Sequence, residues 1–374
     1  MIGNALQDKW ASRCAASLLA AALMLLNACA SGPPADYPFQ QQRPLALLPV
    51  SRSAVTDQRA AFRAYFCQLS ATEGQSLPEP QPCAEALVEL AGEGKADHRV
   101  DAQAITRQRY RIVIVLGIGW DCLQAFVDVD KLPHRHLAQL GYDVTLLHVD
   151  ALSSSANNAS QIVTQLTQLE AEGDKKPIIM AGYSKGAVDI LEALARDQPG
   201  TRNVAAVLSV AGSIGGSPLA DATSQGTVDL MRFAPGAQCD VGDDGALHSL
   251  RTDVRQDWLA RHTLPDTIRS YSMVALPRAG RVSAILEPGY AILEDITPLN
   301  DSNVLFYDAV IPGSTLLGYA NADHWAIALP VARSSPMLGA TVVDANRYPR
   351  EVLWQAMIEF IINDLENTEQ GKGE

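Results

Sequence analysis

The sequence predicts an α/β fold in which helices cover both faces of a mainly parallel β-sheet. Short, continuous apolar runs recur between residues 111 and 320, and helix-compatible stretches separate them. Continuous apolar runs are typical of strands that are buried on both faces, and their alternation with helices implies right-handed crossovers. The chain has 374 residues, of which 47% are hydrophobic. We therefore expect one large domain over residues 46–374.

The elements are predicted from their apolar patterns. The expected strands are Arg111–Leu116, Asp143–Val149, the run from Ile178 to Tyr183, Asn203–Val210, Ser270–Leu276 and Leu316–Ala320. The expected helices are His134–Leu140, Ser154–Glu172, Ala187–Leu194 and an amphipathic closing helix over Trp354–Asn363. Residues 46–105 form an N-terminal part that we expect to be helical, with helices over Arg59–Leu69 and Ala84–Ala91.

One strand-to-helix junction carries a serine between two glycines. Residues Gly182–Gly186 read Gly-Tyr-Ser-Lys-Gly after a buried-strand run and before an amphipathic helix. This pattern is typical of a nucleophile elbow, in which a sharp turn holds the serine clear of the sheet. The alternative is an ordinary turn with a capping serine. We predict that Ser184 is a nucleophile and that the Lys185 side chain lies in solvent.

A serine nucleophile needs a base and an acid downstream in this fold. His324 is the histidine that follows a late strand in a loop-like setting, because the others precede Ser184 or fall in an insertion. Three aspartates compete for the acid that orients the imidazole: Asp301, Asp308 and Asp323. We favour Asp301, which lies in a polar turn between apolar runs. Asp308 is the alternative, and Asp323 is disfavoured because adjacent side chains in a turn diverge.

The oxyanion of an acyl-transfer reaction needs two backbone N–H donors. One comes from the residue after the nucleophile, Lys185, and the other from the turn after the first core strand. In that turn Gly117 and Gly119 flank Ile118 and allow the backbone a close approach. We predict the N–H of Ile118 as the second donor, with the N–H of Gly119 as the alternative.

Together these motifs resemble the α/β-hydrolase superfamily and, within it, bacterial lipase-like esterases. The matching segments are Leu116–Gly119, Gly182–Gly186, Gly216–Asp221 with its Gly-Ser-x-x-Ala-Asp pattern, Asn300–Asp301 and Asp323–His324. They span residues 111–329. The resemblance implies a serine hydrolase that acts on carboxylic esters through an acyl-enzyme and that needs no metal or other cofactor. Two departures, Leu116 in place of a histidine and Ser302 in place of a glycine, weaken the case for true lipid substrates.

The N-terminus reads as an export signal. Lys9 and Arg13 precede an apolar Ala/Leu-rich run that is short for a membrane span. Residues 1–28 are therefore predicted to be a signal peptide, and the sequence before Cys29 resembles a bacterial lipobox, in which the cysteine is lipid-modified with palmitate. The alternative is simple cleavage near Ala30. Residues 29–45 are expected to form a tether to a membrane, with the outer membrane favoured.

Charge and cysteines narrow the function classes further. The net charge of −13 excludes a basic nucleic-acid surface. Four cysteines remain after Cys14 and Cys29, and in an exported protein an even number favours disulfides. Of three possible pairings we favour Cys67–Cys83, which leaves Cys122–Cys239; free buried thiols are the alternative.

The chemistry predicted at Ser184 leaves the substrate open. Residues 220–266 form a long insertion that is either a lid over the substrate or a passive surface excursion. The predicted partners are a small-molecule or lipid-like ester and a membrane through the N-terminal anchor. The same residues would also serve a thioesterase, an amidase, a polyester depolymerase or an acyltransferase. A further alternative is a non-catalytic, lipid-anchored binding protein on a hydrolase scaffold.

Overall fold

The computed structural model describes residues 54–95, 106–123, 126–173, 175–196, 198–224 and 239–371. The predicted signal peptide, Cys29, the tether and the middle of the insertion lie outside these residues. Within them, no helix combines the length and the apolar character that a membrane span requires.

The core of the described chain is an eight-stranded sheet in the order β1-β8-β7-β6-β5-β3-β4, with β2 beside β8. Every neighbouring pair is parallel except β2 with β8, which confirms the predicted fold class. The strand bounds are β1 Thr56–Asp57, β2 Leu87–Val88, β3 Arg111–Val115, β4 Asp143–Leu147, β5 Ile178–Tyr183, β6 Val204–Val210, β7 Arg269–Ala275 and β8 Thr315–Ala320.

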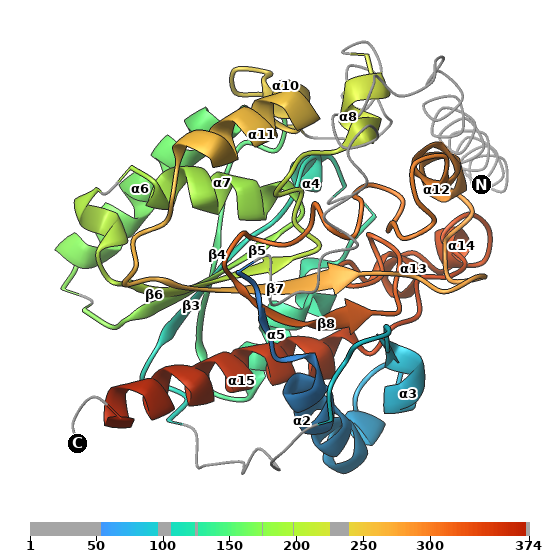
Figure 1. The fold of residues 1–374 in the computed structure, drawn as a ribbon, viewed down its shortest axis with the longest axis horizontal. Helices are drawn as coiled ribbons and strands as arrows, with labels where there is room; N and C mark the ends of the chain where they lie inside the picture. Colours follow the sequence, from blue (N-terminus) through green and yellow to red (C-terminus); the bar gives the residue numbers. More distant parts are fainter. Residues whose placement is uncertain are drawn as a thin grey trace, which may run out of the picture.

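Helices cover both faces of this sheet (Figure 1). One face carries α6 (Ser155–Ala171), α7 (Lys185–Leu194) and α11 (Thr252–Arg261), and the other carries α2 (Arg59–Thr72), α5 (Pro133–Gln139) and α15 (Arg350–Gly371). Shorter elements join them: η3 Gly74–Ser76, α3 Cys83–Ala86, α4 Trp120–Leu123, η4 Val129–Lys131, η5 Pro199–Thr201, α8 Pro218–Ala222, α10 Ala246–Ser249, α12 Glu287–Glu294, α13 Val331–Ser334 and α14 Pro336–Gly339.

The apolar runs are continuous because alternate residues of each strand enter two separate cores. On β3, Ile112 and Ile114 belong to the core that also holds apolar residues of α2, α5 and α15, whereas Val113 and Val115 belong to the core on the side of α6 and α7. Side chains along a strand point alternately to opposite faces, so a strand that is covered on both sides needs apolar residues at every position. This is the physical basis of the strand predictions.

The closing helix differs from its prediction. α15 runs longer than Trp354–Asn363, and its polar residues Gln355, Glu359 and Asn363 are buried along with its apolar ones. The expected exposed face is absent because α2 and α5 lie on the same face of the sheet as α15 and pack against it. The Glu359 carboxylate accepts hydrogen bonds from the Tyr65 hydroxyl at 2.6 Å and the Tyr142 hydroxyl at 3.0 Å. These bonds satisfy a polar group that would otherwise be costly to bury.

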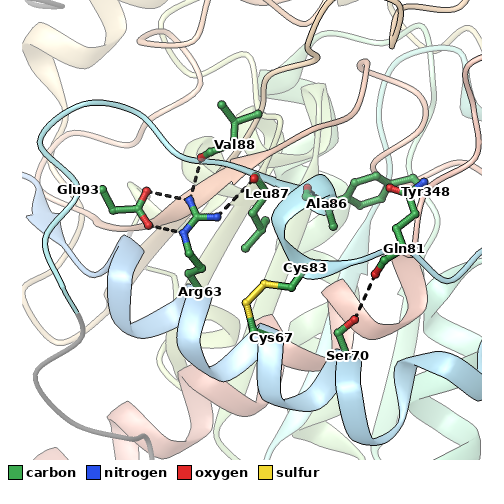
Figure 2. The surroundings of a disulfide bond; sticks show 10 residues. All are labelled: Arg63, Cys67, Ser70, Gln81, Cys83, Ala86, Leu87, Val88, Glu93 and Tyr348. Atoms are coloured by element: carbon green, nitrogen blue, oxygen red, sulfur yellow. Dashed lines mark hydrogen bonds and ion pairs between the residues drawn. A yellow bond between two sulfur atoms is a disulfide. The ribbon is translucent and has the colours of Figure 1, made fainter.

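The N-terminal part is helical at α2 but not over the whole of Ala84–Ala91. Helix α3 ends at Ala86, and Leu87–Val88 forms the strand β2 on β8. Figure 2 shows the reason: the Arg63 guanidinium on α2 donates to the carbonyls of Leu87 at 3.3 Å and Val88 at 3.0 Å. These contacts hold the segment extended against the edge of the sheet. The disulfide Cys67–Cys83, as predicted, links α2 to α3.

Candidate active site

The elbow residue Ser184 lies between the end of β5 and the first residue of α7. Its φ of 56° and ψ of −128° place a non-glycine residue in a sparsely populated region. The neighbouring glycines are required by space, because a Cβ on Gly182 would lie 2.3 Å from Ala187 Cα and one on Gly186 would lie 2.3 Å from the Val115 carbonyl oxygen. The close packing of β3, β5 and α7 therefore forces the turn and holds Ser184 above the sheet.

The structure brings three predicted residues into one hydrogen-bonded chain. His324 Nε2 lies 2.8 Å from Ser184 Oγ, and His324 Nδ1 lies 2.7 Å from Asp301 Oδ2. All three residues are buried. The other carboxylate oxygen of Asp301 accepts from the N–H groups of Asn303 and Val304, at 2.9 and 2.7 Å. Asp301 is thus fixed from one side and meets the imidazole from the other.

The two competing aspartates lie elsewhere. Asp308 packs beside Gly215, where an added Cβ would come within 2.2 Å of its Oδ1. Asp323 accepts hydrogen bonds from the N–H and Oγ of Ser283, and from the N–H groups of Trp325 and Ala326. Burial raises the pKa of the Asp323 carboxyl above its ordinary value. Asp323 therefore shapes the loop that carries His324 and does not contact the imidazole.

Sequence reasoning missed Tyr183, which supports the same histidine. Its hydroxyl donates to the backbone carbonyl of His324 at 2.7 Å. Burial raises the pKa of Tyr183 well above its usual range, so the hydroxyl stays protonated and can donate. The elbow pattern leaves this position free, and no other signal in the sequence marks the contact.

The turn after β3 lies directly against the serine. A Cβ on Gly117 would lie 2.7 Å from Ser184 Cβ, so only glycine permits this approach. Gly119 has a φ of 71° and donates its N–H to the Ala151 carbonyl at 3.3 Å. Because the N–H of Gly119 already donates this hydrogen bond, the geometry favours the N–H of Ile118 as the predicted oxyanion donor of the turn. Lys185 begins α7, and the first N–H groups of a helix have no intrahelical acceptor.

The side chain of Lys185 is not in solvent, contrary to prediction. It is 1% exposed and forms an ion pair with Asp189, which is equally buried. The prediction was wrong because the helical layer formed by α6 and α7 closes over this side chain, which local sequence cannot show.

The returning half of the insertion is anchored to the loop after β4. The N–H of Leu152 donates to the Asp240 carbonyl, and Asp243 accepts from Ser153 and Ser154. The predicted disulfide Cys122–Cys239 joins this return to α4, directly after the turn at Gly117–Gly119. Its last part, α11, packs into the helical layer with Trp258 buried, so that part forms no lid.

Among the described residues, one further group has metal-ligand chemistry. Ligand atoms of His148, Asp150 and Asp240 lie within 4.8 Å of one another. His148 Nε2 lies 3.0 Å from Asp240 Oδ2, and the two side chains are 60% and 59% exposed. Exposed groups of this kind are common without a metal, and we assign none to this one.

Neither protein-family models nor curated protein sequences match this chain. A solved structure does: that of a metagenomic carboxyl esterase is 35% identical, has a TM-score of 0.76, and covers 86% of this chain and 96% of its own. The chain belongs to the α/β-hydrolase superfamily. Two weaker matches are the mature Bacillus licheniformis lipase BlEst2 (19% identity, TM-score 0.47, 64% and 93% covered) and lipase 1 of Pelosinus fermentans (12% identity, TM-score 0.46, 68% and 99% covered).

Proposed function

We propose that this α/β-hydrolase is an exported, lipid-anchored serine esterase that cleaves carboxylic esters through an acyl-enzyme. The observation that carries the proposal is the continuous chain from Ser184 Oγ through His324 to Asp301, with distances of 2.8 and 2.7 Å. Its similarity to a carboxyl esterase over most of both chains supports ester bonds as the substrate class.

In the first half-reaction, Ser184 Oγ attacks the ester carbonyl carbon while His324 Nε2 accepts the hydroxyl proton. Asp301 stabilises the imidazolium through the bond at Nδ1. The carbonyl oxygen becomes an oxyanion that the N–H groups of Ile118 and Lys185 stabilise. The carbon–oxygen bond to the alcohol then breaks, the alcohol leaves with the proton from His324, and Ser184 retains the acyl group.

In the second half-reaction, water takes the place of the alcohol. His324 Nε2 accepts a proton from that water, and the resulting hydroxide attacks the acyl carbon. The same two N–H groups stabilise the second oxyanion. Its collapse breaks the bond to Ser184 Oγ, which regains the proton from His324, and the carboxylic acid is released.

The role of Ser184 is tested by Ser184→Ala in the full chain. We expect hydrolysis of p-nitrophenyl butyrate to fall by about 10⁵- to 10⁶-fold and labelling by a fluorophosphonate to disappear. Ser209→Ala is the matched control: Ser209 is buried on β6, and its Oγ has no hydrogen-bond partner among the described residues. Full activity in the Ser184 variant contradicts the mechanism, and a wild-type protein that takes no label supports the non-catalytic scaffold.

The membrane anchor is tested separately at Cys29. In the native host, the wild-type protein is expected in the membrane fraction with palmitate attached. Cys29→Ser should lose the label and the membrane association while the esterase activity per molecule stays unchanged. Retention of the variant in the membrane fraction contradicts lipid anchoring.

A further inference from the structure

The residue after the nucleophile carries a buried charge that its local setting does not favour. Lys185 Nζ lies 2.7 and 2.9 Å from the two carboxylate oxygens of Asp189, and each side chain is 1% exposed. Removing two charges from water is costly, and apolar residues of similar volume usually stabilise a fold as well or better. The stability of the fold therefore does not explain why the Lys185–Asp189 ion pair is buried at this position.

The order of the two charges along the helix is also unfavourable. Lys185 is the first residue of α7, and Asp189 lies one turn later. The N-terminus of a helix carries partial positive charge and favours anions, so a cation here and an anion further along oppose the helix dipole. The helix would gain from the reverse order. The pair is thus poorly suited to a role in helix stability.

The contacts of Asp189 lead out of α7 to a loop. Asn158 on α6 donates its Nδ2 both to Asp189 Oδ2, at 2.8 Å, and to the backbone carbonyl of Asp150, at 3.0 Å. Asn158 is also buried. Lys185 is therefore tied, through Asp189 and Asn158, to the loop that follows β4.

The same loop holds the other side of the predicted oxyanion hole. The next residue, Ala151, accepts the N–H of Gly119 at 3.3 Å, and Gly119 directly follows Ile118. The carbonyl of Asp150 is thus linked, through Asn158 and Asp189, to Lys185. The adjacent carbonyl of Ala151 is linked directly to the turn after β3.

We infer that the buried network of Lys185, Asp189 and Asn158 positions the oxyanion hole, by fixing the N–H of Lys185 relative to the N–H of Ile118 through the Asp150–Ala151 carbonyls. This inference rests on the proposed esterase function. The side chains are positioning residues that act through the backbone, and they do not contact the substrate. The network explains why a charge is retained where solvent does not reach it.

Two variants test the network without leaving a buried charge unpaired. The double variant Lys185→Met, Asp189→Leu removes both charges and keeps the approximate volumes. Asn158→Leu keeps the ion pair and removes its link to the loop. Loss of an entire oxyanion donor lowers kcat by about 10²- to 10³-fold, so misplacing one should cost less. We expect kcat to fall about tenfold in the double variant and about threefold in Asn158→Leu, with KM nearly unchanged.

The measurement is kcat per active site with p-nitrophenyl butyrate, after titration with a fluorophosphonate. Because a trifluoromethyl ketone forms a tetrahedral oxyanion adduct, its Ki should rise by the same factor as kcat falls. Lys176→Met is the matched control, since it removes a partly exposed pair with Asp143 that lies outside the network. A purely structural role would lower the melting temperature or the titratable fraction and leave kcat per site and Ki unchanged.

The outcomes separate the two proposals. Unchanged kcat per site and Ki in both network variants, beside an active wild type and an inactive Ser184→Ala, overturn the positioning role alone. A wild-type protein that hydrolyses no ester overturns the esterase proposal on which the positioning role rests.

Discussion

The two halves of the candidate site are supported by different means. On the histidine side, Asp301 and His324 are held by short hydrogen bonds within one cluster of loops, and Tyr183 adds a bond from the elbow. On the oxyanion side, the turn at Ile118 and the start of α7 are connected through the loop after β4. The hydrogen bonds that support the histidine side are therefore local. Those that support the oxyanion side connect α7, α6 and the loop after β4.

Each half also has its own disulfide. Cys67–Cys83 joins residues 16 apart and fixes α3, whose Glu85 and Ala86 carbonyls accept from Asn321 just before His324. Cys122–Cys239 joins residues 117 apart and fixes the return of the insertion beside the turn at Ile118. The histidine side thus has a short covalent loop as a supplement to its hydrogen bonds. The oxyanion side relies on a long loop that brings a distant segment into place.

The largest expected effect is on the histidine side. Asp301→Asn should lower kcat by about 10⁴-fold, because an amide cannot hold the imidazole in the required tautomer or stabilise its cation. Asp308→Asn is the matched control and should keep its kcat per titrated site. Steady-state kinetics with p-nitrophenyl butyrate decide between them, and the opposite ranking would make Asp308 the acid.

Removal of the long-loop disulfide should have the next largest effect. In the chain-entropy account, Cys122→Ser with Cys239→Ser lowers the free energy of unfolding by about 5 kcal/mol, because the released loop is long. We also expect a lower kcat per active site, since the insertion then packs less firmly beside Ile118. Guanidinium unfolding and titrated kinetics measure the two effects. Unchanged kinetics would show that the oxyanion side does not depend on this covalent link.

Removal of the short-loop disulfide should cost less. Cys67→Ser with Cys83→Ser is expected to lower the free energy of unfolding by about 3 kcal/mol. The kcat per site should stay close to wild type, because β2 and the bonds to Asn321 still hold the histidine loop. A larger loss of kcat here than in the Cys122 and Cys239 variant would reverse the comparison.

The smallest expected effect is a loss of local stability in acid at residues 239–249, the returning part of the insertion. Burial alone would raise the pKa of Asp243, but hydrogen bonds from Ser154, Ser153 and Gly245 outweigh it and lower the pKa to about 2. An unfolded aspartate titrates near pH 4, so this contribution is complete above about pH 4 and is lost as the pH falls toward 2. The hydrogen-exchange protection factors of residues 239–249, which are corrected for the intrinsic pH dependence of amide exchange, should therefore fall over that range. Asp243→Asn should exchange faster already at neutral pH and respond less to acid.

The sequence predicted the features that depend on local pattern. The main strands were predictable because burial on both faces requires continuous apolar residues, and the elbow because its glycines are required by close packing. Strands β1 and β2 were not, since two-residue strands carry no periodicity. The burial of Lys185 and Glu359 was also missed. Lys185 pairs with Asp189 one turn along, but the layer of α6 and α7 that buries the pair is not visible in the local sequence. Glu359 depends on Tyr65, which comes from a distant part of the chain.

The packing of α2 against α15 has a consequence for how the molecule folds. Tyr65 and Glu359 are 294 residues apart, so the aromatic face of α2 gains its partner only when almost the whole chain is available. A chain that is exported from its N-terminus first therefore leaves Phe62 and Phe66 without this partner until the residues of α15 follow. The Cys67–Cys83 bond closes a short loop and can form before α15 is present. It would then join α2 and α3 into one unit before either contacts α15. We therefore expect docking of this unit onto α15 to be a late step, because it joins the first and last segments of the domain.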